Sequence, residues 1–79
     1  MKFSTIKYDI EKGRHLDYYF TWYKYRVNVS VLQDVLLYTI TDEEGSSVSF
    51  TVCKEDYMKM TYKELLKIVN QNLYYGEWC

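Results

Sequence analysis

Few side chains in this sequence are suited to nucleophilic or metal chemistry. The chain has a single histidine, His15, and two cysteines, Cys53 and Cys79. A nucleophilic thiol needs a base beside it and a further group that orients the base. A structural zinc site needs four ligands, usually arranged in closely spaced pairs. The three residues lie far apart along the chain, so their spacing favours neither a Cys–His nucleophile nor a metal site.

Other motifs typical of enzymes are also missing from the sequence. The three glycines are isolated from one another, so no glycine-rich loop is available to hold phosphate. The carboxylate pairs Glu43/Glu44 and Glu55/Asp56 fall in segments that connect expected elements, where solvent leaves their pKa values untuned for acid–base catalysis. We therefore expect a protein that is not an enzyme and that needs no cofactor.

Charge is distributed unevenly along the chain. The net charge of −1 argues against a protein that is basic over its whole surface, as many nucleic-acid-binding domains are. Residues 1–31 carry a net +3, residues 32–56 a net −5 and residues 57–79 a net +1. An acidic surface could bind Arg and Lys side chains of a partner and imitate phosphate. The candidate partner-binding residues are Asp42, Glu43, Glu44, Glu55 and Asp56.

A second candidate surface combines aromatic rings with cations. In an extended strand, every second side chain lies on the same face. Stacking rings next to basic groups are typical of surfaces that bind single-stranded nucleic acid. The residues concerned are Phe20, Trp22, Lys24 and Arg26.

The strongest helix signal lies near the C-terminus, at residues 62–75. Thr61 and Glu64 have the spacing of a capping box at its start, and Gly76 could end it in the left-handed conformation. An apolar stripe follows steps of three and four residues. Such a stripe either covers the protein's own sheet or binds a membrane or a partner groove, and the mildly basic polar face favours the first. The stripe consists of Tyr62, Leu65, Leu66, Val69 and Leu73.

The preceding chain has patterns typical of strands. Alternating residues predict a strand over 3–10, although Phe3, Ile6 and Ile10 also fit helical spacing. A long β-like run predicts a strand over 18–31 that bends or bulges, with its odd-numbered residues beneath the helix. Within that run, a helical stripe from Leu16 to Tyr23 is the alternative.

Residues 35–41 and 48–53 complete the predicted sheet as the arms of a hairpin, joined by an acidic, glycine-containing turn. Residues 54–59 cross to the helix, and the aromatic tail after Tyr74 has no predicted position. The sequence thus predicts a single α+β domain over residues 1–79. Its expected architecture is a four-stranded antiparallel meander with one C-terminal helix packed on one face.

The location expected for the protein is the cytoplasm. The first residues lack the apolar run of a signal peptide, and no segment has the length needed to span a membrane. Two cysteines without a disulfide framework fit a reducing compartment. We expect no membrane partner.

The order of elements resembles that of small phage-encoded inhibitors of the type II anti-CRISPR kind. The resemblance covers Leu36–Val52 and Thr61–Trp78: a hairpin, an acidic turn with a glycine, a crossover and a capped helix followed by Gly and Trp. It implies a non-enzymatic inhibitor in a host cell's cytoplasm, whose acidic turn faces a basic nucleic-acid channel in a nuclease complex. The alternatives are a single-stranded nucleic-acid-binding domain and a structural homodimer that associates through a sheet edge or the aromatic tail.

Overall fold

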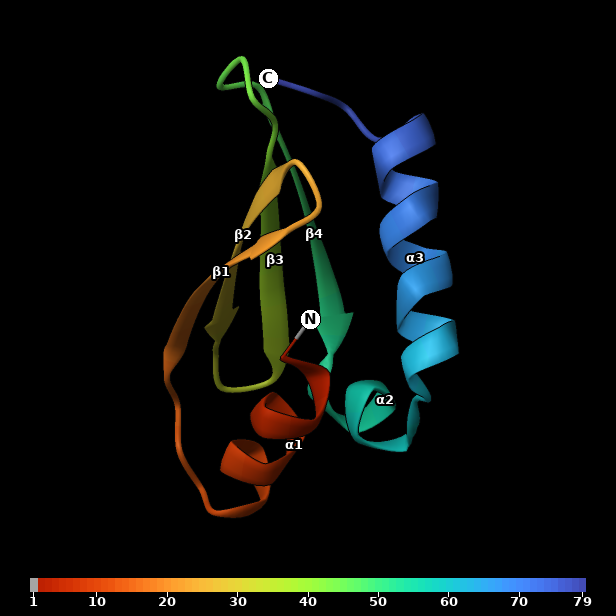
Figure 1. Ribbon diagram of the computed structural model, residues 1–79. Helices are drawn as coiled ribbons and strands as arrows, with labels where there is room; N and C mark the ends of the chain where they lie inside the picture. Colours follow the sequence, from red (N-terminus) through yellow and green to blue (C-terminus); the bar gives the residue numbers. More distant parts are fainter. Residues whose placement is uncertain (1) are drawn as a thin grey trace.

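The computed structural model describes residues 2–79 and contains one antiparallel sheet with helices packed against it. The strands lie in the order β1-β2-β3-β4, so each strand pairs with its neighbour in the sequence. Figure 1 shows α3 alongside the sheet, with α1 and α2 at its lower end. The predicted α+β class and four-stranded meander are confirmed, but three helices accompany the sheet within residues 2–79, where one was expected. The elements are α1 Phe3–Glu11, β1 Asp17–Trp22, β2 Tyr25–Val31, β3 Val35–Thr41, β4 Ser47–Cys53, α2 Lys54–Lys59 and α3 Tyr62–Tyr75.

The strand predicted over residues 3–10 is wrong, because this segment belongs to helix α1. Phe3, Ile6 and Asp9 are buried on one side of the helix, at the three-residue spacing that a helix requires. A strand would have placed Tyr8 on the same face as Ile6, but Tyr8 is exposed. The alternation of large and polar residues was therefore misleading, and the helical spacing decides the structure.

The single long strand predicted over residues 18–31 is also wrong. The chain reverses at Tyr23 and Lys24, and Trp22 pairs with Tyr25 across this two-residue connection. Tyr23 has a φ of 55°, in the left-handed region that few residues other than glycine adopt. The division of this segment into β1 and β2 supplies the fourth strand in place of the one that became α1.

The turn changes which side chains face the helices. In β2 the odd-numbered residues Val27, Val29 and Val31 are buried, as predicted. In β1 the more buried side chains are even-numbered, because Phe20 pairs with Val27 in the antiparallel register. The expected change of face does occur, but a tight turn produces it instead of a bulge.

The second hairpin is formed by β3 and β4. The bounds of β3 are those predicted, 35–41, and β4 begins one residue before the predicted range 48–53. The carboxylate of Asp42 accepts hydrogen bonds from the backbone N–H groups of Glu44 and Ser46, both at 2.9 Å. Gly45 has a φ of 90°, which a side chain would disfavour. Asp42 therefore holds the turn together from within.

Helix α3 begins with the predicted capping box. The Thr61 hydroxyl accepts the N–H of Glu64 at 3.2 Å, and the Glu64 carboxylate accepts the N–H of Thr61 at 3.0 Å. Leu65 and Val69 are fully buried against the sheet side of the molecule. These two residues of the stripe thus cover the protein's own core, as favoured from the sequence, whereas Leu66 and Leu73 are half-buried and Tyr62 is exposed.

Gly76 does not end α3 in the left-handed conformation, because its φ is −69°. Its small size is required by close contacts instead. A Cβ atom on Gly76 would lie 2.3 Å from the carbonyl oxygen of Asn72 and 2.6 Å from Cγ2 of Val48. The glycine allows the chain to leave the helix directly against β4.

The core lies between the sheet and the helices. Tyr57 lies on α2, in the segment predicted only as a crossover, and is fully buried. Its hydroxyl forms a hydrogen bond of 2.9 Å with the hydroxyl of Tyr38, in which either group can be the donor. The rings of Phe3 and Tyr57 meet edge to face at 5.1 Å. The buried apolar residues are Phe3, Ile6, Val27, Val29, Val31, Leu36, Tyr38, Ile40, Val48, Val52, Tyr57, Leu65 and Val69.

The C-terminal tail returns to the sheet. The indole N–H of Trp78 donates to the carbonyl of Leu73 at 3.2 Å. Cys79 and Ser47 exchange two backbone hydrogen bonds, at 2.9 and 3.2 Å. The tail therefore occupies the outer edge of β4 at the point where that strand begins.

Candidate functional site

The β1–β2 turn carries a compact group of aromatic rings. The Trp22 ring lies edge to face with Tyr23 at 5.1 Å and is stacked with Tyr25 at 6.1 Å. The ammonium group of Lys24 lies 5.5 Å from the centre of the Tyr25 ring. The Tyr23 side chain is 83% exposed. The turn thus presents a large ring to solvent at a position where the backbone is strained.

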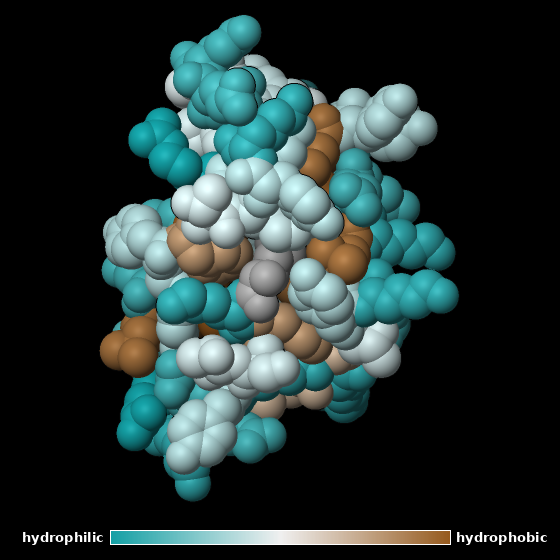
Figure 2. Space-filling view, in the orientation of Figure 1, coloured by the Kyte–Doolittle hydropathy of each residue, from teal (hydrophilic) through white to brown (hydrophobic). Residues whose placement is uncertain are grey.

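A groove of about 560 Å³ separates this turn from helix α3. The turn supplies Trp22, Tyr23, Lys24 and Tyr25, and α3 supplies Tyr62, Leu66, Asn70 and Leu73. We call these eight residues the hairpin–helix groove. In Figure 2, hydrophobic surface lies right of centre, where Figure 1 places the space between the hairpin and α3.

The groove continues along α3 into a second depression. Asn70 borders both hollows, and Tyr74 and Tyr75 stand at the far side of the second one. Both tyrosines are largely exposed. Aromatic rings are therefore exposed both at the β1–β2 turn and at the end of α3.

Among the eight residues of the groove, Lys24 is the one that carries a charge. Lys24, Lys63 and Lys67 form no salt bridge within residues 2–79. On α3, the pKa of Glu64 is lowered mainly by the hydrogen bond from the Thr61 backbone, with further contributions from the Thr61 side chain and from Lys7 and Lys67. On the sheet side, Lys24 borders a small depression together with Asp42, Glu43 and Glu44 of the β3–β4 turn.

The five acidic residues proposed from the sequence do not form one surface. Asp42, Glu43 and Glu44 lie at the β3–β4 turn, whereas Glu55 and Asp56 lie on α2 at the opposite end of β4. The Asp42 carboxylate is engaged within its turn, as described above. On α2, Glu55 pairs with Lys59 at 3.5 Å. At the turn, Glu43 and Glu44 remain as a neighbouring pair of exposed acids, which border a depression shared with Lys24.

The aromatic and basic strand face proposed from the sequence is also divided. Phe20 and Trp22 point toward the helices, where they pack against the core. Arg26 pairs with Thr21 and Thr41 on the opposite, open face of the sheet. The expected platform therefore does not exist, although Trp22 and Lys24 meet again in the hairpin–helix groove. The partners that they find there on α3 could not be identified from local spacing.

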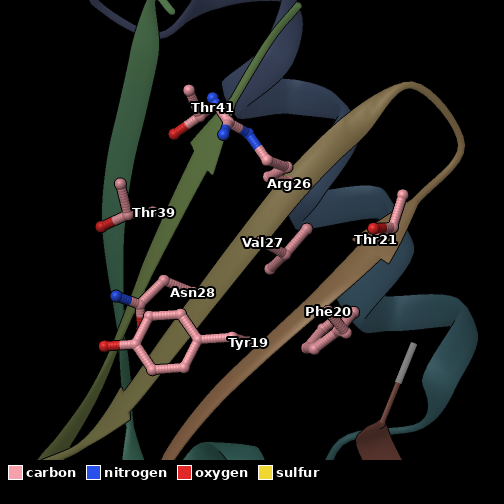
Figure 3. A pocket seen from close by; sticks show the side chains of 8 residues that line it. All are labelled: Tyr19, Phe20, Thr21, Arg26, Val27, Asn28, Thr39 and Thr41. Carbon is pink, nitrogen blue, oxygen red and sulfur yellow. The ribbon is translucent and has the colours of Figure 1, made fainter.

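The open face of the sheet contains a shallower and more polar depression of about 470 Å³. Figure 3 shows the side chains of Tyr19, Asn28 and Thr39 on this side, with Phe20 and Val27 directed to the other. The Oδ1 atom of Asn28 is buried and has no hydrogen-bond partner within residues 2–79. This face offers hydroxyl groups and one amide, with Arg26 as its cation.

One cluster of titratable groups links α1 to β1. The Asp9 carboxylate accepts hydrogen bonds from the Tyr18 hydroxyl and from the Arg14 guanidinium, the latter at 3.0 Å. The hydrogen bond from Tyr18 is the main cause that lowers the pKa of Asp9. Burial, followed by the bond to Asp9, raises the pKa of Tyr18 to about 12. All three groups are satisfied by one another, so the cluster fastens the helix to the sheet.

The residues considered for nucleophilic or metal chemistry are all exposed. His15 lies in the α1–β1 connection, Cys53 ends β4 and Cys79 pairs with Ser47 at the other end of that strand. Residues 2–79 contain no group of three or more His, Cys, Asp or Glu side chains arranged to hold a metal ion. Within the same residues, none of the helices has the length and apolar character needed to cross a membrane.

Comparisons with protein-family models, curated proteins and solved structures found no match to this chain. Its function is therefore inferred from the surfaces described above.

Proposed function

We propose that this protein is a non-enzymatic binding protein that holds a segment of a protein partner in the hairpin–helix groove. The observation that carries the proposal is the gathering of four rings, Trp22, Tyr23, Tyr25 and Tyr62, beside Lys24, which has no ion pair within residues 2–79. Tyrosine and tryptophan are enriched at protein interfaces because they bury much area and lose few rotamers.

The groove chemistry defines the segment that fits. Leu66 and Leu73 offer apolar contacts at the floor, and Asn70 offers an amide. Lys24 favours a ligand that carries a carboxylate. The proposed ligand is therefore a segment with aliphatic or aromatic anchors and an acidic residue, which the rings enclose and Lys24 orients.

The proposed role is that of a small inhibitor, of the phage type, which blocks a host protein by occupying its binding surface in the cytoplasm. Two exposed, unpaired cysteines support a reducing compartment. Glu43 and Glu44 supply an acidic contact at the β3–β4 turn, next to Lys24. A nuclease complex with basic surfaces is one partner that suits those carboxylates, while the groove supplies the apolar contact.

The test is a selection from a displayed library of random peptides, with a groove variant as the comparison. Tyr23→Asn removes the ring but tolerates the left-handed backbone, and Lys24→Glu reverses the charge. We expect acidic peptides with apolar anchors to be enriched by the wild-type protein. Each groove substitution should weaken the binding of a selected peptide by about thirtyfold, the effect of losing a central interface residue.

The matched controls are Tyr8→Asn and Lys12→Glu, which change an exposed ring and a lysine on the α1 side. They should leave peptide binding unchanged. If no peptide is enriched, or if the selected peptides bind the groove variants as tightly as the wild type, the proposal is refuted.

Single-stranded nucleic acid is the second candidate, because Lys24 stands among stacked rings in the same groove. A titration with a short oligothymidylate, followed by the fluorescence of Trp22 in a Trp78→Phe background, separates the two. Salt-dependent binding of the oligonucleotide that is lost in Tyr23→Asn, without any selected peptide, would favour nucleic acid over a protein partner.

A further inference from the structure

The outer edge of β1 has free backbone hydrogen-bonding groups. The N–H of Val31 donates to the carbonyl of Leu16 at 3.2 Å, which fixes the phase of the β1–β2 ladder. In an antiparallel pair, bonded and outward-facing positions alternate. The backbone groups of Asp17, Tyr19 and Thr21 therefore point away from β2. Within residues 2–79, β1 is an outer strand of the sheet and pairs on one side alone, with β2.

The edge also lacks the features that usually prevent strand pairing. Natural edge strands are commonly protected by proline, lysine or a bulge. β1 contains none of these, and its one charged residue is Asp17 at its start. Tyr18 and Phe20 are only half-buried, and Tyr19 is 72% exposed. The edge is therefore open and flanked by aromatic side chains on both faces.

We propose that β1 pairs with β1 of a second copy of this chain, in an antiparallel arrangement centred on Tyr19. The two sheets then join into one. Asp17, Tyr19 and Thr21 of each copy satisfy their outward N–H and carbonyl groups on the other. This inference is independent of the hairpin–helix groove and goes beyond the function proposed for it.

The side chains of β1 are self-complementary in this register. On the open face, Tyr19 meets Tyr19 of the second copy, and Asp17 faces Thr21, which can donate its hydroxyl to the carboxylate. On the helix-covered face, Tyr18 faces Phe20, and the close spacing of positions that share no backbone bonds brings their rings together. No like charges face one another within the paired strands. These features favour a second copy over an unrelated strand.

The association should be reversible. A pair of six-residue strands buries less than the roughly 1,200–2,000 Å² of a standard interface, so the dimer belongs to the weak class.

The first test is analytical ultracentrifugation of the full chain over a wide concentration range. Tyr19→Lys places two ammonium groups beside the two-fold axis of the dimer and removes the ring pair. The control is Tyr75→Lys, which makes the same change at an 84% exposed position at the end of α3. Association should weaken by at least about tenfold in Tyr19→Lys, as expected from the lost aromatic pair and the added repulsion, and stay unchanged in Tyr75→Lys.

The second test fixes the register by cross-linking. In a Cys53→Ser/Cys79→Ser background, Tyr19→Cys puts two thiols on a pair with a Cα separation of about 5.5 Å, within disulfide range. Mild oxidation should give a covalent dimer at low protein concentration, whereas Tyr75→Cys should give little.

Amide exchange by nuclear magnetic resonance provides a readout that does not depend on substitution. The N–H groups of Asp17, Tyr19 and Thr21 should become protected as concentration rises, while those of Tyr18 and Phe20 are protected at every concentration. A chain that remains monomeric up to millimolar concentration refutes the proposal. So does a dimer that Tyr19→Lys leaves intact.

Discussion

The buried tyrosine pair in the core allows the value of one hydrogen bond to be measured. The hydroxyls of Tyr38 and Tyr57 lie 2.9 Å apart, and neither has another hydrogen-bond partner within residues 2–79. Replacing either residue by Phe leaves the remaining hydroxyl buried and unsatisfied. Such a group costs about 1–3 kcal/mol, out of a stability of about 4–12 kcal/mol expected for a domain of this length.

Removal of both hydroxyls should be far less harmful. The double variant leaves no unsatisfied group and keeps the rings that fill the core, so we expect it to lose only about 0–1 kcal/mol. The sum of the two single losses should therefore exceed the loss in the double variant by about 1–6 kcal/mol. This difference is the coupling free energy of the pair.

The measurement is urea unfolding of the four proteins, followed by circular dichroism and analysed by linear extrapolation. Tyr75→Phe serves as the control, because its hydroxyl is exposed and its loss should change the free energy of unfolding by less than about 0.5 kcal/mol. If the two single losses add up to the loss in the double variant within about 0.5 kcal/mol, the two hydroxyls do not depend on each other. The description of the pair as mutually satisfied would then fail.

Three further predictions concern pH and close contacts. Burial raises the pKa of Tyr38 to about 12 and that of Tyr57 further. The stability that these two groups contribute is therefore complete below about pH 10 and is lost as pH rises through their folded-state pKa values. Thermal melts should show this fall in stability, and the fall should be smaller in the double Phe variant. The pKa of Asp9 is lowered, so the stability that its carboxylate contributes is present above about pH 4 and is lost as pH falls through the folded-state pKa. Asp9→Asn should therefore flatten the decline of the melting temperature in acid. An unchanged decline would contradict the role of the cluster in fastening α1 to the sheet. Gly76→Ala should destabilise the protein by about 1–3 kcal/mol in urea unfolding, because the added methyl overlaps the Asn72 carbonyl; a neutral result would show that the tail moves aside at little cost.

The sequence supported the correct prediction of those parts of the fold that depend on local signals. The capping box at Thr61 and the apolar stripe defined α3, and alternating residues with an acidic turn defined the β3–β4 hairpin. The segment at residues 3–10 was ambiguous, because Ile6 satisfies both a two-residue and a three-residue period. Its helical structure is decided by the bonds to Asp9 and by the burial of Phe3 against the rings of Tyr57 and Tyr62, which are distant in the chain.

The candidate groove was not predicted, and the reason lies in the β1–β2 turn. Two-residue hairpin turns are usually recognised by Asn-Gly or a similar pair, whereas this one is Tyr23-Lys24. A weaker signal was present: buried positions are even-numbered up to Trp22 and odd-numbered from Tyr25 onward, and such a change of parity indicates a two-residue reversal. The opposite wall on α3 is brought to the turn by tertiary packing alone.

The two hydrogen bonds between Cys79 and Ser47 bear on how far any strand-to-strand assembly could grow. A sheet that is open along both outer strands can add copies without limit and lengthen into a fibre. Here an incoming strand at β4 would first have to displace the tail, whereas β1 offers its edge directly. Assembly through β1 with a two-fold axis uses up the open edge of both copies, so growth ends at a pair.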